Sequence, residues 1–67
     1  MVERRRLRPH ELAVVRVLEM SRFEMTTNEI SQDSNMSWRT AKRTLERLHE
    51  EGIVSRHRRG RSIYWGL

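Results

Sequence analysis

Cysteine is absent from this 67-residue chain, and proline and glycine are scarce, with one and three residues. Without cysteine the chain has no disulfide, no thiolate zinc site and no cysteine nucleophile. No apolar run approaches the about 20 residues that a membrane-spanning helix needs, and the N-terminus lacks the apolar stretch of a secretory signal. A chain this short buries only about 60% of its unfolded surface. We therefore expect one small, cytoplasmic domain held by packing alone, without the deep cleft of an enzyme.

Acidic residues are fewer than basic ones. Nine Asp and Glu stand against 14 Lys and Arg, which gives a formal net charge of +5. Lys42 is the only lysine, so 13 of the 14 are arginine. Because the planar guanidinium group suits phosphates and guanine edges, this composition favours a polyanionic partner. Arginine-rich codon usage would give the same composition, so the positions of the arginines must distinguish a polyanionic partner from codon usage.

The first predicted element is a helix over residues 10–21, preceded by a basic arm over residues 1–8. Pro9 suits the first helical position, where its missing N–H costs nothing. One face carries residues at the spacing of 3 and 4 that a buried helix face requires: Ala13, Val14, Val17, Leu18 and Ser21. Leu12 and Val15 are predicted to point away from that face, toward the arm or a partner.

A second, short helix is predicted from the capping box formed by Thr26 and Glu29 to about Ser34. Ile30 is its only large apolar side chain. Asn35 then tolerates the left-handed conformation of a tight turn. The sequence therefore predicts a turn that leads directly into a third helix.

The third helix is predicted over residues 38–51, with Ser37 as its N-cap and Gly52 at its C-terminal end. Its buried stripe is Ala41, Leu45 and Leu48, with Trp38 and Thr44 at the margins. The exposed face begins with three basic side chains and no acidic ones: Arg39, Lys42 and Arg43. Further along it alternates in sign, as a solvated helix surface does.

Residues 53–67 are predicted to form a two-stranded hairpin. Ile53 and Val54 open the first strand, Gly60 lies in the turn, and the second strand places Ile63 and Trp65 on one face. The tip has no acidic residue beside its cations: Arg56, His57, Arg58, Arg59 and Arg61. This is a concentrated cationic loop.

Three helices, a tight turn between the second and third, and a basic hairpin resemble a winged helix-turn-helix of the α+β class. Residues 25–67 are similar to the DNA-binding part of ArsR-, MarR- and Lrp-type prokaryotic regulators. Residues 37–48 resemble the recognition helix of that family, residues 50–54 its junction into the wing, and residues 59–65 its wing turn and returning strand. The resemblance implies a DNA-binding domain over residues 9–67.

In such a domain the N-terminal half of the recognition helix reads bases in the major groove, while the flanking elements hold phosphates. The resemblance therefore implies Arg39 and Arg43 as base readers, with Ser37, Thr40 and Lys42 nearer the DNA backbone. Trp38 either packs in the core or lies on a sugar or thymine methyl. The wing cations would contact phosphates or the minor groove: Arg56, His57, Arg58, Arg59 and Arg61. Arg4, Arg5, Arg6 and Arg8 either follow the DNA backbone or solubilise the chain.

The expected function is that of a small, nucleoid-associated transcription regulator that binds double-stranded DNA. A protein–protein interaction module and a nonspecific nucleic-acid-binding protein are the alternatives. No enzyme, metal, cofactor or small-molecule ligand is expected, because His10, His49 and His57 lack metal-ligand spacing and no glycine-rich phosphate loop is present. The sequence leaves a monomer and a homodimer through Leu12 and Val15 equally open.

Overall fold

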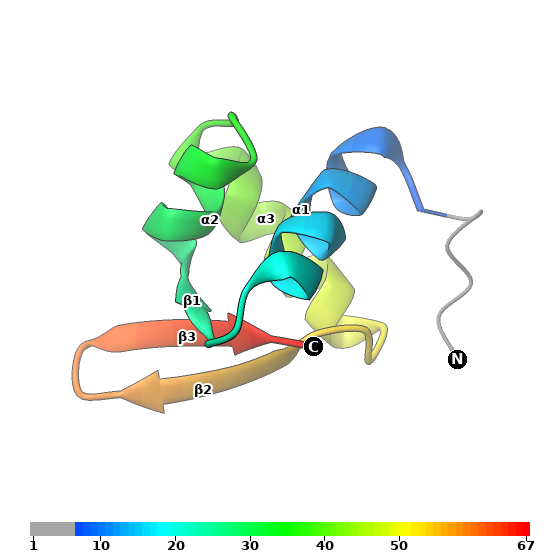
Figure 1. Ribbon diagram of the computed structural model, residues 1–67. Helices are drawn as coiled ribbons and strands as arrows, with labels where there is room; N and C mark the ends of the chain where they lie inside the picture. Colours follow the sequence, from blue (N-terminus) through cyan, green and yellow to red (C-terminus); the bar gives the residue numbers. More distant parts are fainter. Residues whose placement is uncertain (1–6) are drawn as a thin grey trace.

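A computed structural model describes residues 7–67 of the chain. Along the chain it has α1 (Pro9–Met20), β1 (Met25–Thr26), α2 (Thr27–Asp33), α3 (Trp38–Glu50), β2 (Ser55–Arg59) and β3 (Ser62–Gly66). The three helices lie on one side of a small antiparallel sheet, and the β2–β3 turn projects beyond them (Figure 1). This is the predicted α+β arrangement of a winged helix-turn-helix, with the β2–β3 hairpin as the wing.

The predicted capping box sets the start of α2. The Thr26 side chain accepts a hydrogen bond from the Glu29 amide (3.2 Å), and the Glu29 carboxylate accepts one from the Thr26 amide (2.9 Å). This capping box satisfies amides that have no partner within the first turn of α2. Glu11 does the same for α1 by accepting a hydrogen bond from the Arg8 amide at 2.9 Å.

Helices α2 and α3 end in the same type of turn. Asn35 (φ 54°) and Gly52 (φ 77°) both take the left-handed conformation. After α2 the Met36 amide donates to the Ser31 carbonyl (3.0 Å), and after α3 the Ile53 amide donates to the Leu48 carbonyl (2.9 Å). Both are Schellman motifs, which use otherwise unpaired carbonyls at a helix end. The α2–α3 turn is therefore tight, and it holds the two helices in direct contact.

The core lies between the helices and the sheet. It contains Val14, Val15, Leu18, Ile30, Ala41, Leu45, Leu48, Val54 and Trp65. The predicted stripe of α3 is buried, as is Ile30 of α2. The Trp65 indole N–H donates to the Thr27 hydroxyl at 2.9 Å, and this buried hydrogen bond joins the wing to the start of α2.

The predicted buried face of α1 is wrong, because the helix is rotated about its axis by part of a turn relative to the prediction. Val15, expected to point outward, is only 2% exposed, whereas Ala13, Val17 and Ser21 are only partly buried. The alternative set Glu11, Val14, Val15 and Leu18 also has helical spacing, and it is the set that packs. Because α1 is apolar on two sides, its periodicity alone does not choose between them.

The sheet also differs from the prediction. Its strand order is β1-β3-β2, and β1 pairs with β3 through Met25 opposite Trp65 and Thr26 opposite Tyr64. A two-residue strand has no periodicity to detect, so β1 was not predicted. Ile53 and Val54 precede β2 rather than open it, and Val54 belongs to the core.

No helix within residues 7–67 combines the length and the apolar character that crossing a bilayer demands.

Candidate nucleic-acid interface

The start of α3 presents polar and basic side chains to solvent. The Ser37 hydroxyl caps the helix by accepting from the Thr40 amide at 3.1 Å, and it donates to the Thr40 hydroxyl at 2.9 Å. On the opposite side Ala41, Thr44, Leu45 and Leu48 are buried. The core thus fixes the rotation of α3 and turns its other face outward.

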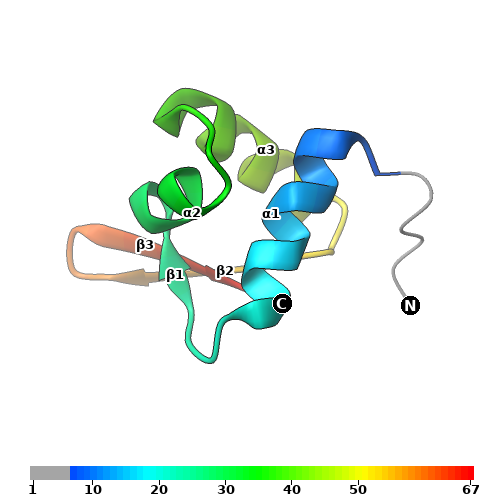
Figure 2. The ribbon, with the colours of Figure 1, turned by 45° about the horizontal axis from the view of Figure 1, so that its top comes forward.

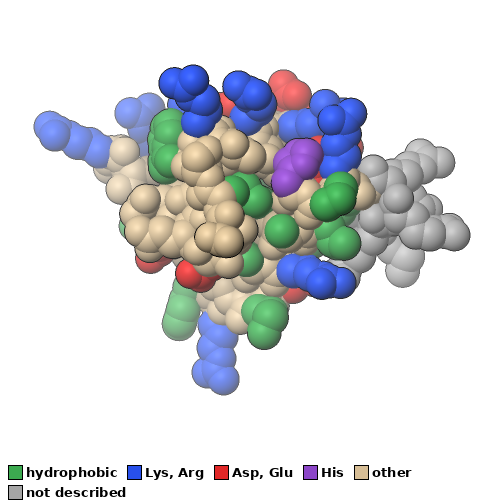
Figure 3. All heavy atoms as spheres, turned by 90° about the horizontal axis from the view of Figure 1, so that it is seen from above, with side chains coloured by type: hydrophobic (Ala, Val, Ile, Leu, Met, Phe, Trp, Pro, Cys, Tyr) green, Lys and Arg blue, Asp and Glu red, His purple; other side chains and the backbone are tan. Residues whose placement is uncertain are grey.

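Arg39, Lys42 and Arg43 lie on that outward face and are exposed, as predicted. We call these three residues the α3 basic cluster. No carboxylate among residues 7–67 lies within ion-pair distance of any of them. In the view of Figure 3 most of the Lys and Arg side chains gather along the upper edge, on the side of the molecule where α3 lies in Figure 2. The charge of this cluster is therefore available to an external anion.

Trp38 stands at the first position of α3 and is 50% exposed, so of its two predicted alternatives the one that packs it in the core is wrong. The Lys42 ammonium lies over its ring, 5.2 Å from the centroid. This cation–π contact places a flat apolar surface next to the α3 basic cluster. The helix start therefore offers both charge and an aromatic face.

The second half of α3 is different because its cation is paired. The Arg47 Nε lies 3.3 Å from Oε2 of Glu11 and 3.3 Å from Oε2 of Glu51. Glu11 is buried, so this ion pair ties α3 to α1. Arg47 thus contributes to the fold, and the arginine and lysine side chains of α3 that have no carboxylate of residues 7–67 within ion-pair distance lie in its N-terminal half.

The wing divides its cations between two faces. Residues that are paired across a hairpin share a face. His57 pairs with Tyr64 and Arg59 with Ser62, whereas Arg58 pairs with Ile63 and Arg56 with Trp65. Because Trp65 is buried beneath the helices, we call the Arg56 and Arg58 side the inner face and the His57 and Arg59 side the outer face.

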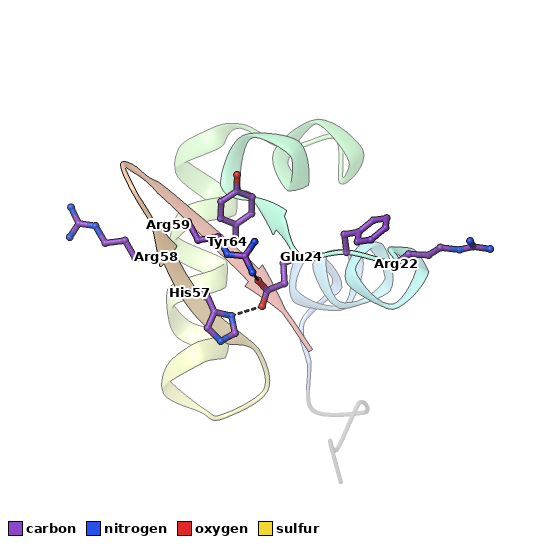
Figure 4. A pocket seen from close by; sticks show the side chains of 7 residues that line it. Arg22, Glu24, His57, Arg58, Arg59 and Tyr64 are labelled. Carbon is purple, nitrogen blue, oxygen red and sulfur yellow. Dashed lines mark hydrogen bonds and ion pairs between the residues drawn. The ribbon is translucent and has the colours of Figure 1, made fainter.

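The outer face carries an acidic partner that the hairpin sequence does not contain. The Glu24 carboxylate hydrogen-bonds His57 Nδ1 through Oε2, and its Oε1 lies 3.8 Å from Arg59 Nη2. The Arg59 guanidinium also lies 5.6 Å from the centroid of the Tyr64 ring. In Figure 4 His57 and Arg59 point toward Glu24, whereas Arg58 points away.

On the inner face and at the turn the cations have different neighbours. Arg56 lines a cavity of about 340 Å³ together with Glu46 and Glu50 of α3. Arg58 and Arg61 have no carboxylate of residues 7–67 within ion-pair distance, and the Arg58 Nε donates to the Gly60 carbonyl at 3.3 Å. Among the five predicted wing cations, three thus have no carboxylate of residues 7–67 within ion-pair distance: Arg56, Arg58 and Arg61.

Glu24 was missed by the sequence analysis because it lies 33 residues before His57. The signal that locates it is the pairing of β1 with β3, since continuing that register sets Glu24 opposite Gly66. A Cβ added to Gly66 would lie 3.2 Å from the Glu24 Cγ. Glycine at this position therefore leaves room for the Glu24 side chain beside the wing.

A shallow cavity of about 680 Å³ lies along the outer face, between the wing and the α1–β1 connection. Its polar lining is formed by Arg22, Glu24, His57, Arg58, Arg59 and Tyr64 (Figure 4). Across residues 7–67 no three His, Cys, Asp or Glu side chains converge as a metal site would require. The predicted arm residues Arg4, Arg5 and Arg6 lie outside the described residues, and Arg8 is the exposed N-cap of α1.

No family model matches this chain, and no curated protein is similar to it at a significant level.

Proposed function

We propose that this protein binds double-stranded DNA sequence-specifically and acts as a small transcription regulator, similar to ArsR-, MarR- and Lrp-type proteins. In this proposal α3 enters the major groove and the wing contacts flanking phosphates or the minor groove. The observation that carries the proposal is the α3 basic cluster, which is exposed and free of carboxylates within residues 7–67. A protein–protein module would instead favour a neutral or apolar surface here.

Arg39 and Arg43 are the proposed base readers. They are four residues apart, so they lie one turn apart on the same side of α3. A guanidinium group makes two parallel hydrogen bonds to O6 and N7 of guanine, which distinguishes this base from the other three. Lys42, Ser37 and Thr40 would contact the DNA backbone, and the exposed ring of Trp38 would pack on a sugar or a thymine methyl.

Arg58 and Arg61 are the proposed phosphate or minor-groove contacts of the wing. No carboxylate of residues 7–67 lies within ion-pair distance of either, whereas His57 and Arg59 must leave Glu24 before they bind a phosphate. Phosphate contacts supply affinity but not sequence discrimination. The wing would therefore orient the protein on the duplex while α3 selects the site.

The test is a selection of random duplexes by the purified protein, followed by binding of the enriched pool across a salt series. We expect a defined motif that prefers duplex DNA to single strands and to duplex RNA. Loss of that preference in Arg43→Ala, and its retention in the matched charge control Arg22→Ala, would assign the reading to α3. If no motif emerges and binding only falls with salt, the basic surface is a nonspecific grip and the proposal fails.

A further inference from the structure

The helices of residues 7–67 cover only one face of the sheet (Figure 1). Tyr64 stands on β3, the middle strand, and its cross-strand partner on β2 is His57, so both side chains belong to the outer face. Thr26 of β1 is the partner of Tyr64 on its other side. The outer face is thus a sheet surface with an aromatic side chain on its middle strand and cations beside it.

A second aromatic ring borders the same face from the α1–β1 connection. Phe23 is 82% exposed and lines the cavity of about 680 Å³ together with Tyr64. The Ser21 hydroxyl holds its backbone, since it donates to the Phe23 carbonyl (2.5 Å) and accepts from the Phe23 amide (3.3 Å). This turn fixes the place of Phe23 while its ring stays in water. Such a ring offers a flat apolar surface to a ligand that can stack on it.

Cations line the cavity on both sides of the two rings. Arg22 and Arg58 lie at opposite ends of it in Figure 4, and Arg59 and His57 lie between them. Glu24 is the only carboxylate that residues 7–67 contribute to the lining. The cavity is shallow and its charges are spread along it, so it suits an elongated anion that carries flat groups between its charges.

We propose that the outer face binds a single-stranded nucleic acid, at a site separate from the one that α3 is proposed to offer to duplex DNA. Bases of the strand would stack on Phe23 and Tyr64, and its phosphates would contact Arg22 and Arg58. In a duplex the flat faces of the bases are stacked on one another, so the two rings suit unpaired bases. Every base has such a face, so the site binds strands without sequence preference.

Glu24 does not prevent this binding, because its carboxylate already pairs with His57 and Arg59. The N–H groups of an unpaired base can in addition donate hydrogen bonds to a carboxylate. An acidic peptide would also meet the cations of the cavity, but its carboxylates would leave the Phe23 ring unused. The combination of rings and cations therefore favours a nucleic acid strand over a peptide.

The test is fluorescence anisotropy of the full chain with labelled oligothymidylate and oligouridylate of about 12 nucleotides at low salt. Phe23→Ala should weaken binding about five- to tenfold, the loss of one stacked base, whereas Phe23→Tyr should keep it. Because Phe23 is exposed, both variants should fold, which circular dichroism verifies. The matched control is Met20→Ala, an 88% exposed apolar residue outside the cavity, which should bind like the wild type. Tighter binding of one oligonucleotide identifies the strand as DNA or RNA.

Two variants that each remove one positive charge separate this site from α3. Arg22→Ala should weaken single-strand binding about two- to fivefold and leave duplex binding unchanged, and Arg39→Ala should do the reverse. The proposal is overturned if neither oligonucleotide binds, if Phe23→Ala binds like the wild type, or if Arg39→Ala weakens single-strand binding as much as Arg22→Ala. It is also overturned if oligoglutamate competes as well as unlabelled oligonucleotide, since the site would then recognise charge alone. Single-strand binding is measured without a duplex motif, so the proposed function is tested separately.

Discussion

The two basic regions of this protein hold their charge in different ways. In the α3 basic cluster Arg39, Lys42 and Arg43 project from a helix whose other side is anchored in the core, and no carboxylate of residues 7–67 pairs with them. In the wing, Glu24 from a distant segment engages His57 and Arg59. The wing has the denser positive charge in the sequence, but within residues 7–67 part of that charge is paired with Glu24, whereas the charge of the α3 basic cluster has no such pair.

This difference teaches that the number of cations does not measure the strength of an anion-binding surface. An anion that binds the outer face of the wing must first displace Glu24, whereas one that binds α3 displaces only water. Exposed ion pairs are worth about 0.2–1 kcal/mol each, so the Glu24 contacts adjust the affinity of the wing rather than abolish it. Four changes test the comparison.

The largest expected effect comes from removing the side chain that packs the wing against the helices. Trp65→Ala deletes a buried side chain and its hydrogen bond to Thr27, and it should lower the free energy of unfolding by about 3–5 kcal/mol. Urea denaturation measures this change. Thr27→Val keeps the packing but removes the hydrogen bond, and should cost about 1 kcal/mol. Equal losses in the two variants would mean that the hydrogen bond, not packing, holds the wing.

The next effect concerns α3. Arg43→Ala should weaken specific duplex binding by about 1–3 kcal/mol and relax the base preference at one position. Arg22→Ala removes the same charge from an exposed residue outside α3, so it should change the duplex affinity and the base preference little. Fluorescence anisotropy on matched and mismatched duplexes measures both quantities. A uniform loss on all duplexes would reduce Arg43 to a phosphate contact.

Within the wing, neighbouring arginines provide their own control. Arg58→Ala should weaken binding to all duplexes about equally and lower the slope of log affinity against log salt by about 1. Arg59→Ala should lower it less, because Glu24 already lies beside this cation. Titrations at several salt concentrations give the slopes. Identical slopes for the two variants would remove the distinction between the inner and outer faces.

The smallest expected effect is a gain. Glu24→Gln keeps the shape of the side chain but frees His57 and Arg59, so duplex affinity should rise about two- to fivefold. Asp33→Asn raises the net charge equally at an exposed residue of α2, away from the wing and α3, and it controls for long-range attraction. If both variants gain the same amount, Glu24 acts only through its charge and not through its contacts.

Signals that act over three or four residues were enough to predict much of the fold. The capping box of Thr26 and Glu29, the N-cap Ser37, and the left-handed turns at Asn35 and Gly52 all lie where the sequence placed them. The buried stripe of α3 was predicted because its other faces are polar, which leaves one rotation of the helix that buries apolar surface. The exposure of Arg39 and Arg43 follows from the same rotation.

Helix α1, Trp38 and Glu24 could not be predicted in this way. Apolar residues on two sides of α1 permit two rotations, and the packing of Val15 rather than Val17 decides between them. Trp38 is apolar enough for the core, yet its position at the helix start leaves it half exposed beside Lys42. Glu24 reaches the wing only through the pairing of β1 with β3, which joins segments about 40 residues apart.

By itself, therefore, the sequence determined the helix ends, the tight turns, the amphipathic rotation of α3 and the surplus of arginine, because each depends on contacts between near neighbours along the chain. Only the tertiary structure decided which side of α1 is buried and which wing cations have an acidic partner. Both features depend on contacts between segments that are far apart along the chain. Such contacts produce no periodic pattern in the sequence, so sequence periodicity does not reveal them.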